Sequence, residues 1–223
     1  MTPPVLAELL LPLGVVLDPR VLVQLEWLAG ELLRWNRTHN LTAITRPDEV
    51  AEKHLADSLS LLPLLGSARR LLDLGSGAGF PALPLKIARP DLEVVAVDAV
   101  GKKVAFQNHV ARSLRFTGFT AVHGRAESLL DHPACAAKFD VVTARALGSL
   151  PMLARLSMPL LAAGGRLIAM KGAEGEGELA AAEDELAALG LVCTDRHPLR
   201  LPASGAERML LVLASSGPAT GPP

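Results

Sequence analysis

The sequence predicts an α/β protein built on a doubly wound parallel sheet. From residue 69 onward, short apolar runs that are typical of buried strands alternate with stretches of helical periodicity. Strands joined in this way run parallel, with helices covering the sheet. A glycine-rich turn follows the first run and an aspartate ends the second, at the carboxyl ends of strands where such sheets bind ligands.

The composition is that of one sizeable domain with a small appendage. The chain has 223 residues, of which 50% are hydrophobic, and its formal net charge is −1. That charge gives no sign of a strongly basic nucleic-acid binder, so any site for a polyanion must be a local patch. No apolar run reaches the ~20 residues that span a bilayer, and the amino terminus lacks the basic start of a secretory signal. We expect a cytoplasmic monomer with no membrane or DNA partner.

Residues 1–68 are expected to form an N-terminal helical subdomain. Asp18-Pro19 is a favourable helix start, because the aspartate can cap free amides and proline suits the first turn. Apolar residues then recur every three or four positions, which predicts an amphipathic helix. A loop over 38–50 leads to a second helix, which Asp48 is expected to cap.

Residues 69–214 are expected to form the sheet domain. The last two apolar runs have no helix between them and predict an antiparallel hairpin at one edge of the sheet. The tail over 215–223 is small and rich in Pro and Gly, so we expect it to be disordered. The other expected strands cover 70–75, 92–98, 119–124, 139–145 and 164–172, and the expected helices lie near 81–89, 102–115, 149–162 and 175–189.

The glycine-rich turn in DLGSGAG has the spacing G-x-G-x-G, formed by Gly75, Gly77 and Gly79. It lacks the G-x-G-x-x-G spacing of dinucleotide sites and the lysine of a Walker loop. Glycines also make ordinary sharp turns, and that alternative stays open for the turn taken alone. Asp73, near the end of the first strand, can brace the amides of the turn or reach a cationic ligand through water.

Asp98 ends the second strand, 19 residues after Gly79. A carboxylate there can accept hydrogen bonds from both ribose hydroxyls of a nucleoside, although it can also cap the helix that follows. Together with the glycine turn, it indicates a ligand that contains adenosine but no pyrophosphate. S-adenosylmethionine is such a ligand, and it is the cofactor we expect.

These motifs resemble those of a known enzyme family. LLDLGSGAGFP and VVAVDAVGKKVAF look like the first two motifs of the seven-stranded methyltransferases. More narrowly, the chain resembles the bacterial small-subunit (16S) ribosomal RNA guanine-N7 methyltransferases, also called glucose-inhibited division protein B. One departure is Ala82, where the family usually has glycine. The resemblance covers nearly the whole chain and includes NLTAI (40–44), HLADSL (54–59), GRAE (124–127), VVTARAL (141–147) and MKG (170–172).

The resemblance implies a Rossmann-like class I methyltransferase sheet with an N-terminal helical extension. Backbone groups of Ala126 and Glu127 are then expected to read the adenine edge, although the Glu127 side chain can equally be a helix cap. Phe80 is expected to pack against the cofactor or the target base. By matched motif, the expected cofactor residues are Gly75, Gly77, Gly79, Phe80, Asp98, Ala126, Glu127 and Arg145.

Four residues are expected to position the substrate. Arg145 ends an apolar strand, and because an unpaired buried charge is very costly, it should face the cleft and hold the cofactor's carboxylate, an RNA phosphate, or both in turn. Lys171 ends the next strand and is expected to contact phosphate or guanine, unless it is a solvated strand end. Asn40 and His54 match N-terminal family motifs, and His54 can instead tie helix to sheet.

The chain offers no obvious acid-base or metal constellation. Cys135 and Cys193 fit no metal or disulfide spacing, and neither is placed as a nucleophile. Guanine N7 carries a free lone pair and loses no proton on methylation, so alignment and exclusion of water suffice. We therefore assign no catalytic acid or base and no metal.

The expected function is methyl transfer from S-adenosylmethionine to N7 of a guanine in 16S ribosomal RNA. With no tyrosine and 3% aromatic residues, the chain lacks a stacking platform for free RNA, which favours the assembled small ribosomal subunit as substrate. A local basic patch could come from Arg34, Arg37, His39 and Arg46. Two alternatives stay open: the same fold and cofactor acting on a small molecule or protein, and a non-catalytic ribosome assembly factor.

Overall fold

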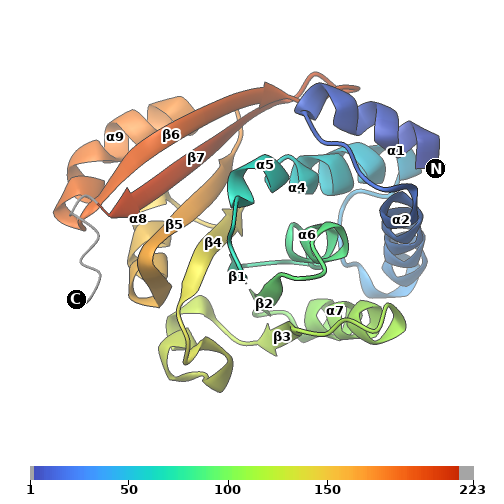
Figure 1. The fold of residues 1–223 in the computed structure, drawn as a ribbon, viewed down its shortest axis with the longest axis horizontal. Helices are drawn as coiled ribbons and strands as arrows, with labels where there is room; N and C mark the ends of the chain where they lie inside the picture. Colours follow the sequence, from blue (N-terminus) through green and yellow to red (C-terminus); the bar gives the residue numbers. More distant parts are fainter. Residues whose placement is uncertain (1–2, 216–223) are drawn as a thin grey trace.

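The computed structural model describes residues 3–215, which contain a seven-stranded sheet in the order β3-β2-β1-β4-β5-β7-β6. Strands β1 to β5 run parallel to one another, whereas β7 is antiparallel to both β5 and β6 (Figure 1). The predicted α/β class, parallel strands and edge hairpin are confirmed. The strands are β1 (Arg70–Leu74), β2 (Glu93–Asp98), β3 (Phe119–His123), β4 (Phe139–Arg145), β5 (Leu161–Lys171), β6 (Leu191–Arg200) and β7 (Glu207–Ser215).

The strand order reverses at β1, which pairs with β2 on one side and with β4 on the other. In open α/β sheets, the crevice beyond the carboxyl ends at such a reversal is where ligands bind. The glycine turn leaves β1 at this point, and Asp98 and Arg145 are the last residues of β2 and β4. The topology therefore brings predicted site residues from three strands to one edge of the sheet.

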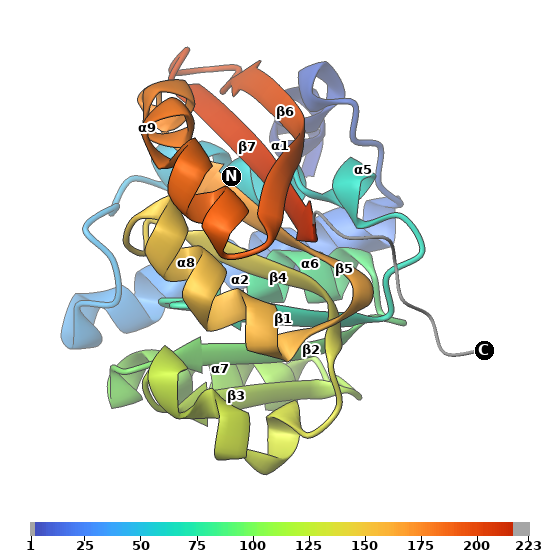
Figure 2. The ribbon, with the colours of Figure 1, turned by 90° about the vertical axis from the view of Figure 1, so that its left-hand side faces the viewer.

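Helices cover both faces of the sheet (Figures 1 and 2). Alternate residues of a strand point to opposite faces, so Leu72 of β1 shares an apolar cluster with α8 and α9, while Leu71 shares another with α5 and α6. Helices α6, α7 and α9 match the predicted segments to within two residues, whereas α8 ends at Ser157 and a 3-10 turn (Met158–Leu160) and the start of β5 replace the rest of the predicted segment 149–162. The helices on the two faces are α5 (Leu62–Leu65), α6 (Ala82–Ala88), α7 (Gly101–Ser113), α8 (Leu150–Ser157) and α9 (Gly175–Ala188).

The described elements before β1 are all helical, as predicted. Their apolar side chains form a single cluster with Phe80 and with residues of α6 and α7, so these helices pack onto the sheet domain. The division of the chain near residue 68 stays a prediction. The elements are α1 (Pro3–Leu10), α2 (Pro19–His39), α3 (Pro47–Val50), a π-helical segment (Ala51–Ala56) and α4 (Asp57–Leu59).

The two predicted helix caps differ in outcome. Asp18 caps α2, because its carboxylate accepts a hydrogen bond from the Arg20 amide at 2.8 Å. The prediction for Asp48 is wrong: the residue lies inside the first turn of α3, and its carboxylate pairs with Arg46. Since Pro47 occupies the first helical position, the cap position falls on Arg46 instead.

The expected disordered tail over 215–223 lies outside the described residues except for Ser215, which is the last residue of β7. Within residues 3–215, the structure contains no helix whose length and apolar character would let it cross a membrane.

Gly79 generates a prediction about stability. Its φ is +92°, and an added Cβ would lie 2.4 Å from Leu83 Cδ1, whereas Gly77 has a φ of +58° and open space around it. Gly77→Ala should therefore carry only the backbone cost of about 1–2 kcal/mol. Gly79→Ala should add an overpacking cost of about 1–3 kcal/mol. Urea unfolding of both variants checks this, and equal losses of stability would contradict the clash at Gly79.

Candidate active site

Two pockets flank the residues that follow β4 at the carboxyl edge of the sheet. Leu147 lines the first, and the preceding residue Ala146 lines the second. We call them the glycine-turn pocket, of about 280 Å³, and the arginine pocket, of about 380 Å³. The glycine-turn pocket is lined by Gly75, Val97, Asp98, Ala99, Val100, Lys103, Gly124, Arg125, Ala126, Glu127, Leu147, Met152 and Leu156. The arginine pocket is lined by Ile44, Lys53, His54, Asp57, Arg145, Ala146, Met170, Lys171, Gly172 and Arg208.

The glycine-turn pocket brings together four of the predicted cofactor residues: Gly75, Asp98, Ala126 and Glu127. A Cβ on Gly75 would lie 3.0 Å from a methyl carbon of Leu147, so the bare backbone lets that side chain approach. Ala126 and Glu127 begin a 3-10 turn that follows β3. The structure thus places residues that are far apart in the sequence around one cavity.

Asp98 is fixed by backbone amides. Its Oδ2 accepts a hydrogen bond from Gly77 N and its Oδ1 accepts one from Val100 N, both at 2.8 Å. The residue is 8% exposed and lines the pocket. Each carboxylate oxygen has more than one lone pair, so both can accept a further bond. Asp98 therefore orients the glycine turn and keeps acceptor capacity for a ligand.

Asp73 lies beneath the turn, fully buried. Its carboxylate accepts hydrogen bonds from Ala82 N at 3.1 Å and from Thr143 Oγ1 at 3.1 Å. Burial raises the pKa of this carboxyl group to about 7, although both hydrogen bonds lower it. Of the two roles predicted for Asp73, the geometry matches the bracing of an amide, at the start of α6.

The remaining predicted cofactor residues do not line the glycine-turn pocket. Gly77 holds Asp98, and Gly79 packs against Leu83. Phe80 is 2% exposed, and its ring stacks on His54 with the centroids 4.7 Å apart. One face of the Phe80 ring is thus covered by the His54 ring of the same chain.

Arg145 lines the arginine pocket rather than the glycine-turn pocket. Its Nη1 donates hydrogen bonds to Lys53 O at 2.9 Å and to Asp57 Oδ2 at 3.2 Å, and its Nη2 lies 3.3 Å from His54 Nδ1. Within residues 3–215, these contacts use three of the five N–H donors of a guanidinium group. Two donors therefore remain for a ligand in the pocket.

His54 is a neutral link between Arg145 and the loop before α3. Since Nδ1 faces a guanidinium donor, it must accept, and Nε2 must carry the proton that it donates to Thr42 Oγ1 at 2.9 Å. Burial and the charge of Arg145 lower the pKa of His54 to about 3. His54 thus orients Arg145 without contributing a charge.

Lys171 lines the arginine pocket, but its ammonium group is already bound. Its Nζ donates to Gly148 O and to Glu178 Oε1, both at 2.9 Å, and the same Glu178 oxygen accepts from Leu150 N at 2.8 Å. The pair of Lys171 and Glu178 therefore anchors the loop that carries Leu147. This anchoring role was absent from the sequence-based prediction of a phosphate or guanine contact.

Asn40 lies outside both pockets. It terminates α2 in a left-handed conformation with a φ of 47°, and its side chain is exposed. Thr42, two residues later in the same motif, reaches His54 instead. The side chain of Asn36 holds this loop by accepting from Leu41 N at 2.6 Å and Thr42 N at 2.9 Å.

Two charged residues of the arginine pocket, Asp57 and Arg208, are not among the predicted site residues. Asp57 is 2% exposed, and its carboxylate accepts from Arg145 on β4 and, at 3.1 Å, from Arg208 on β7. Asp57 could have been found through its motif, HLADSL, whereas Arg208 carried no local signal. With Lys53 and Lys171, these arginines give the arginine pocket four cationic side chains. Asp57 is the one carboxylate that lines the pocket, while Lys53 and Lys171 pair with Glu49 and Glu178 beside it.

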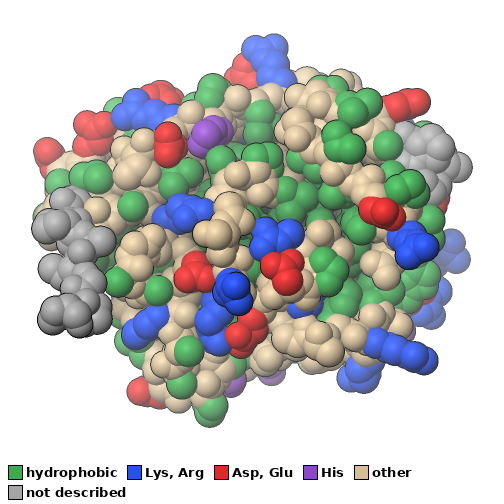
Figure 3. All heavy atoms as spheres, viewed as in Figure 1, with side chains coloured by type: hydrophobic (Ala, Val, Ile, Leu, Met, Phe, Trp, Pro, Cys, Tyr) green, Lys and Arg blue, Asp and Glu red, His purple; other side chains and the backbone are tan. Residues whose placement is uncertain are grey.

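The predicted basic patch, at the end of α2 and in the loop that follows it, is partly neutralised. Arg34 pairs with Glu31, and Arg46 pairs with Asp48. On the face of the molecule seen in Figure 3, acidic and basic side chains are interspersed. The arginine pocket is the better candidate for binding an anion, because its four cationic side chains line one cavity.

His54 generates a prediction about pH. The ordinary pKa of histidine is about 6.5, so His54 of the unfolded chain binds a proton below that pH. In the folded protein the pKa of His54 is about 3, so the side chain stays unprotonated until the pH falls to about that value. Stability conferred by neutral, buried His54 is thus lost as pH falls. His54→Gln removes this loss, so its destabilisation relative to the parent should be smaller at pH 5 than at pH 7.5 by about 2 kcal/mol.

Urea unfolding of both proteins at the two pH values tests this prediction. The raised pKa of Asp73 has the opposite effect, because its stabilising contribution is lost as pH rises towards about 7. Asp73 is present in both proteins, so its contribution cancels in the comparison. A difference in stability that does not change with pH would contradict the neutral state of His54.

Known proteins resemble this chain in sequence over most of its length. The family described as rRNA small subunit methyltransferase G (GidB) matches residues 22–200. A relative from Syntrophotalea carbinolica, named ribosomal RNA small subunit methyltransferase G, is 50% identical over 208 residues, which cover 93% of this chain and 95% of the relative. A relative of the same name from Myxococcus xanthus is 45% identical and covers 91% of this chain and 92% of its own.

Solved structures of methyltransferases share the fold. The Burkholderia thailandensis 1,6-didemethyltoxoflavin-N1-methyltransferase, with bound 1,6-didemethyltoxoflavin and S-adenosylhomocysteine, has a TM-score of 0.58 at 20% identity, covering 85% of this chain and 89% of that one. The precorrin-6y C5,15-methyltransferase from Geobacter metallireducens has a TM-score of 0.56 at 14% identity, covering 72% and 88%. At these identities the likeness shows the class I methyltransferase fold alone. The sequence matches go further, and they establish that the protein is a methyltransferase of the rRNA small subunit methyltransferase G family.

Proposed function

We propose that this enzyme transfers a methyl group from S-adenosylmethionine to N7 of a guanine in the 16S RNA of the small ribosomal subunit. The observation that carries the proposal is the pairing of two pockets across Ala146 and Leu147. One has the bare backbone and the carboxylate that suit a nucleoside, and the other is cationic and suits an RNA strand. The family name of the relatives supports ribosomal RNA as the substrate.

The glycine-turn pocket fits S-adenosylmethionine by the character of its lining. Asp98 offers carboxylate oxygens to ribose hydroxyls, and the turn after β3 offers backbone groups of Ala126 and Glu127 to an adenine edge. Leu147 and Met152 supply apolar walls. When bound, the cofactor supplies an electrophilic methyl group on a sulfonium centre.

The arginine pocket supplies binding and orientation instead of proton transfer. N7 of guanine loses no proton on methylation, so no general base is required, and a neutral His54 is compatible with that chemistry. The two remaining donors of Arg145 can hold a phosphate or the O6 atom of the guanine. Because His54, Lys53 and Asp57 fix the guanidinium group, it is aligned before the substrate arrives.

Two alternative functions, methylation of a small molecule or protein and a non-catalytic role in ribosome assembly, would require different features of the site. A small-molecule or protein substrate would not need several cations in the arginine pocket, and its binding would depend weakly on salt. RNA binding should weaken steeply with salt, because phosphate contacts release counterions. A non-catalytic assembly factor would not need an ordered cofactor pocket beside the cationic one.

The first test is detection of the product. Small ribosomal subunits from a strain that lacks this gene are incubated with the enzyme and S-adenosylmethionine, and the digested RNA is analysed by mass spectrometry. We expect new 7-methylguanosine on intact subunits and less on protein-free RNA. If no 7-methylguanosine forms while the cofactor still binds, the proposed substrate is wrong.

Two substitutions separate the roles of the pockets. Asp98→Ala should weaken S-adenosylmethionine binding by roughly 10- to 150-fold, as expected for loss of charge-assisted hydrogen bonds of about 1.5–3 kcal/mol. Arg145→Ala should abolish methyl transfer, with the fold retained and cofactor affinity within about threefold of the parent, because Arg145 lines the other pocket. Calorimetric titration with the cofactor, together with the methylation assay, checks both. A large loss of cofactor affinity in Arg145→Ala would instead assign Arg145 to the cofactor's carboxylate.

A further inference from the structure

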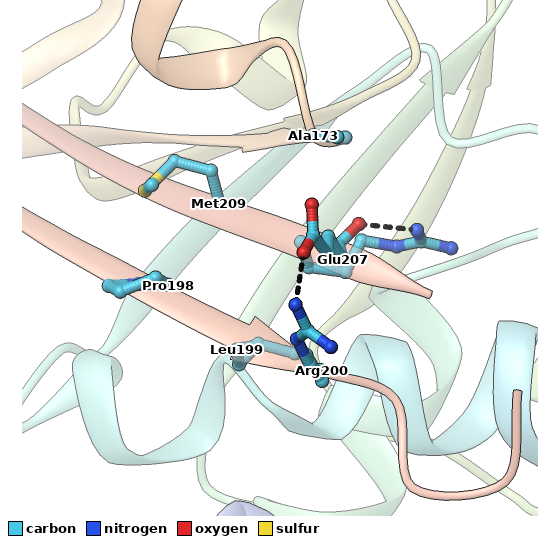
Figure 4. A pocket seen from close by; sticks show the side chains of 8 residues that line it. Ala173, Pro198, Leu199, Arg200, Glu207 and Met209 are labelled. Carbon is cyan, nitrogen blue, oxygen red and sulfur yellow. Dashed lines mark hydrogen bonds and ion pairs between the residues drawn. The ribbon is translucent and has the colours of Figure 1, made fainter. Parts of the chain in front are cut away.

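A third pocket, of about 480 Å³, adjoins the arginine pocket. We call it the strand pocket, because most of its wall comes from the facing ends of β6 and β7 (Figure 4). Gly172 and Arg208 line both this pocket and the arginine pocket. Its volume lies within the range of about 300–1,000 Å³ that is usual for ligand sites. The strand pocket is lined by Gly172, Ala173, Pro198, Leu199, Arg200, Glu207, Arg208 and Met209.

The strand pocket combines an apolar wall with a charged rim. Pro198 lies opposite Met209 and Arg200 lies opposite Glu207 in the ladder between β6 and β7, so these four side chains share one face of the sheet. Figure 4 shows Arg200 and Glu207 turned towards each other, with Nη2 and Oε1 2.5 Å apart. The pocket thus offers apolar surface, one carboxylate and guanidinium groups together.

The walls of the strand pocket are held in place. Glu52 is 3% exposed, and its carboxylate accepts hydrogen bonds from the amides of Ala203 at 2.6 Å and Ser204 at 2.7 Å, in the turn between β6 and β7. Arg208 is anchored by Asp57, and its Nη1 donates to Glu207 O at 2.9 Å. The site is therefore preformed, which lowers the entropy lost when a ligand is ordered.

We propose that the strand pocket binds a nucleotide that adjoins the target guanine in the same RNA strand. The inference rests on the proposed function. A ligand that occupies the arginine pocket and the strand pocket together must pass Arg208, because that residue lines both. A nucleic-acid strand has a phosphate between successive nucleosides, and this phosphate would lie at that boundary. Arg208, which lines both pockets, can hold that phosphate. Arg200, on the same face as Pro198 and Met209, can hold the next phosphate of the strand, while the apolar wall of Pro198 and Met209 packs against the unstacked base. Unpaired bases that are splayed out of the stack are the usual targets of sequence-specific RNA recognition.

Glu207 gives this pocket a base preference. A carboxylate accepts hydrogen bonds only, so it favours a base with an exocyclic amino group and disfavours uracil at its carbonyl edges. The Arg200 guanidinium group holds the Glu207 carboxylate beside the apolar wall, because the two residues are cross-strand neighbours. Glu207 is therefore a candidate specificity-determining residue for the flanking nucleotide.

Arg200→Ala tests the proposal, with Arg196→Ala as the matched control. Both arginines lie on β6, with side chains 74% and 46% exposed, so removing either should leave the fold intact. Arg196 pairs with Glu176 and lies outside the strand pocket. We expect Arg200→Ala to raise KM for small subunits roughly tenfold and to reduce the salt slope of binding by about one, with cofactor affinity unchanged. The control should stay within about twofold of the parent.

The double variant Arg200→Ala with Glu207→Ala separates contact from overall charge. It keeps the net charge of the parent, so restored KM would show that long-range charge alone mattered and would overturn the proposal. A KM that stays high supports a direct contact. If the parent forms 7-methylguanosine while Arg200→Ala behaves like Arg196→Ala, the strand pocket is not a nucleotide site, and the proposed function stands. If the parent forms none, the proposed function itself fails.

Discussion

The buried carboxylate of Asp57 is the interaction on which the arrangement at the carboxyl edge depends. It lies on α4 and accepts hydrogen bonds from Arg145 at the end of β4 and Arg208 near the start of β7. A buried carboxylate without partners would be strongly destabilising, so the chain must bring the two arginines to it. One acidic group thus joins the N-terminal helices to both the parallel strands and the edge hairpin.

The contact of Asp57 with the two arginines also fixes the orientation of the residues around it. Arg145, held by Asp57 and by Lys53 O, donates a hydrogen bond to His54, whose buried ring stacks on Phe80. The charge of Arg145 adds to the effect of burial on the pKa of His54. The polar network accordingly supplies rigid cationic donors instead of a titrating acid or base, which agrees with the proposed chemistry at N7.

A second constraint separates the two pockets of the proposed active site. Ala146 has a φ of 52°, an unfavourable value for a residue with a side chain, and the chain there turns so that Leu147 lies over Gly75. Lys171 and Glu178 hold the following residues through Gly148 O and Leu150 N. The boundary between the pockets is therefore rigid. The strand pocket extends the cationic side of this boundary towards β6 and β7.

The fold class, the strands, the position of the glycine turn and the place of Asp98 at the end of β2 could all be predicted from the sequence alone. These features follow from local patterns, since alternating strands and helices bring the carboxyl ends of parallel strands to one edge. Four other features could not be predicted from the sequence: Phe80 is buried against His54, Asn40 ends a helix, Lys171 anchors a loop, and Arg208 meets Asp57. Those outcomes depend on packing between segments far apart in the chain, as with Asp57 and Arg208, and no local spacing specifies which charged side chains meet there.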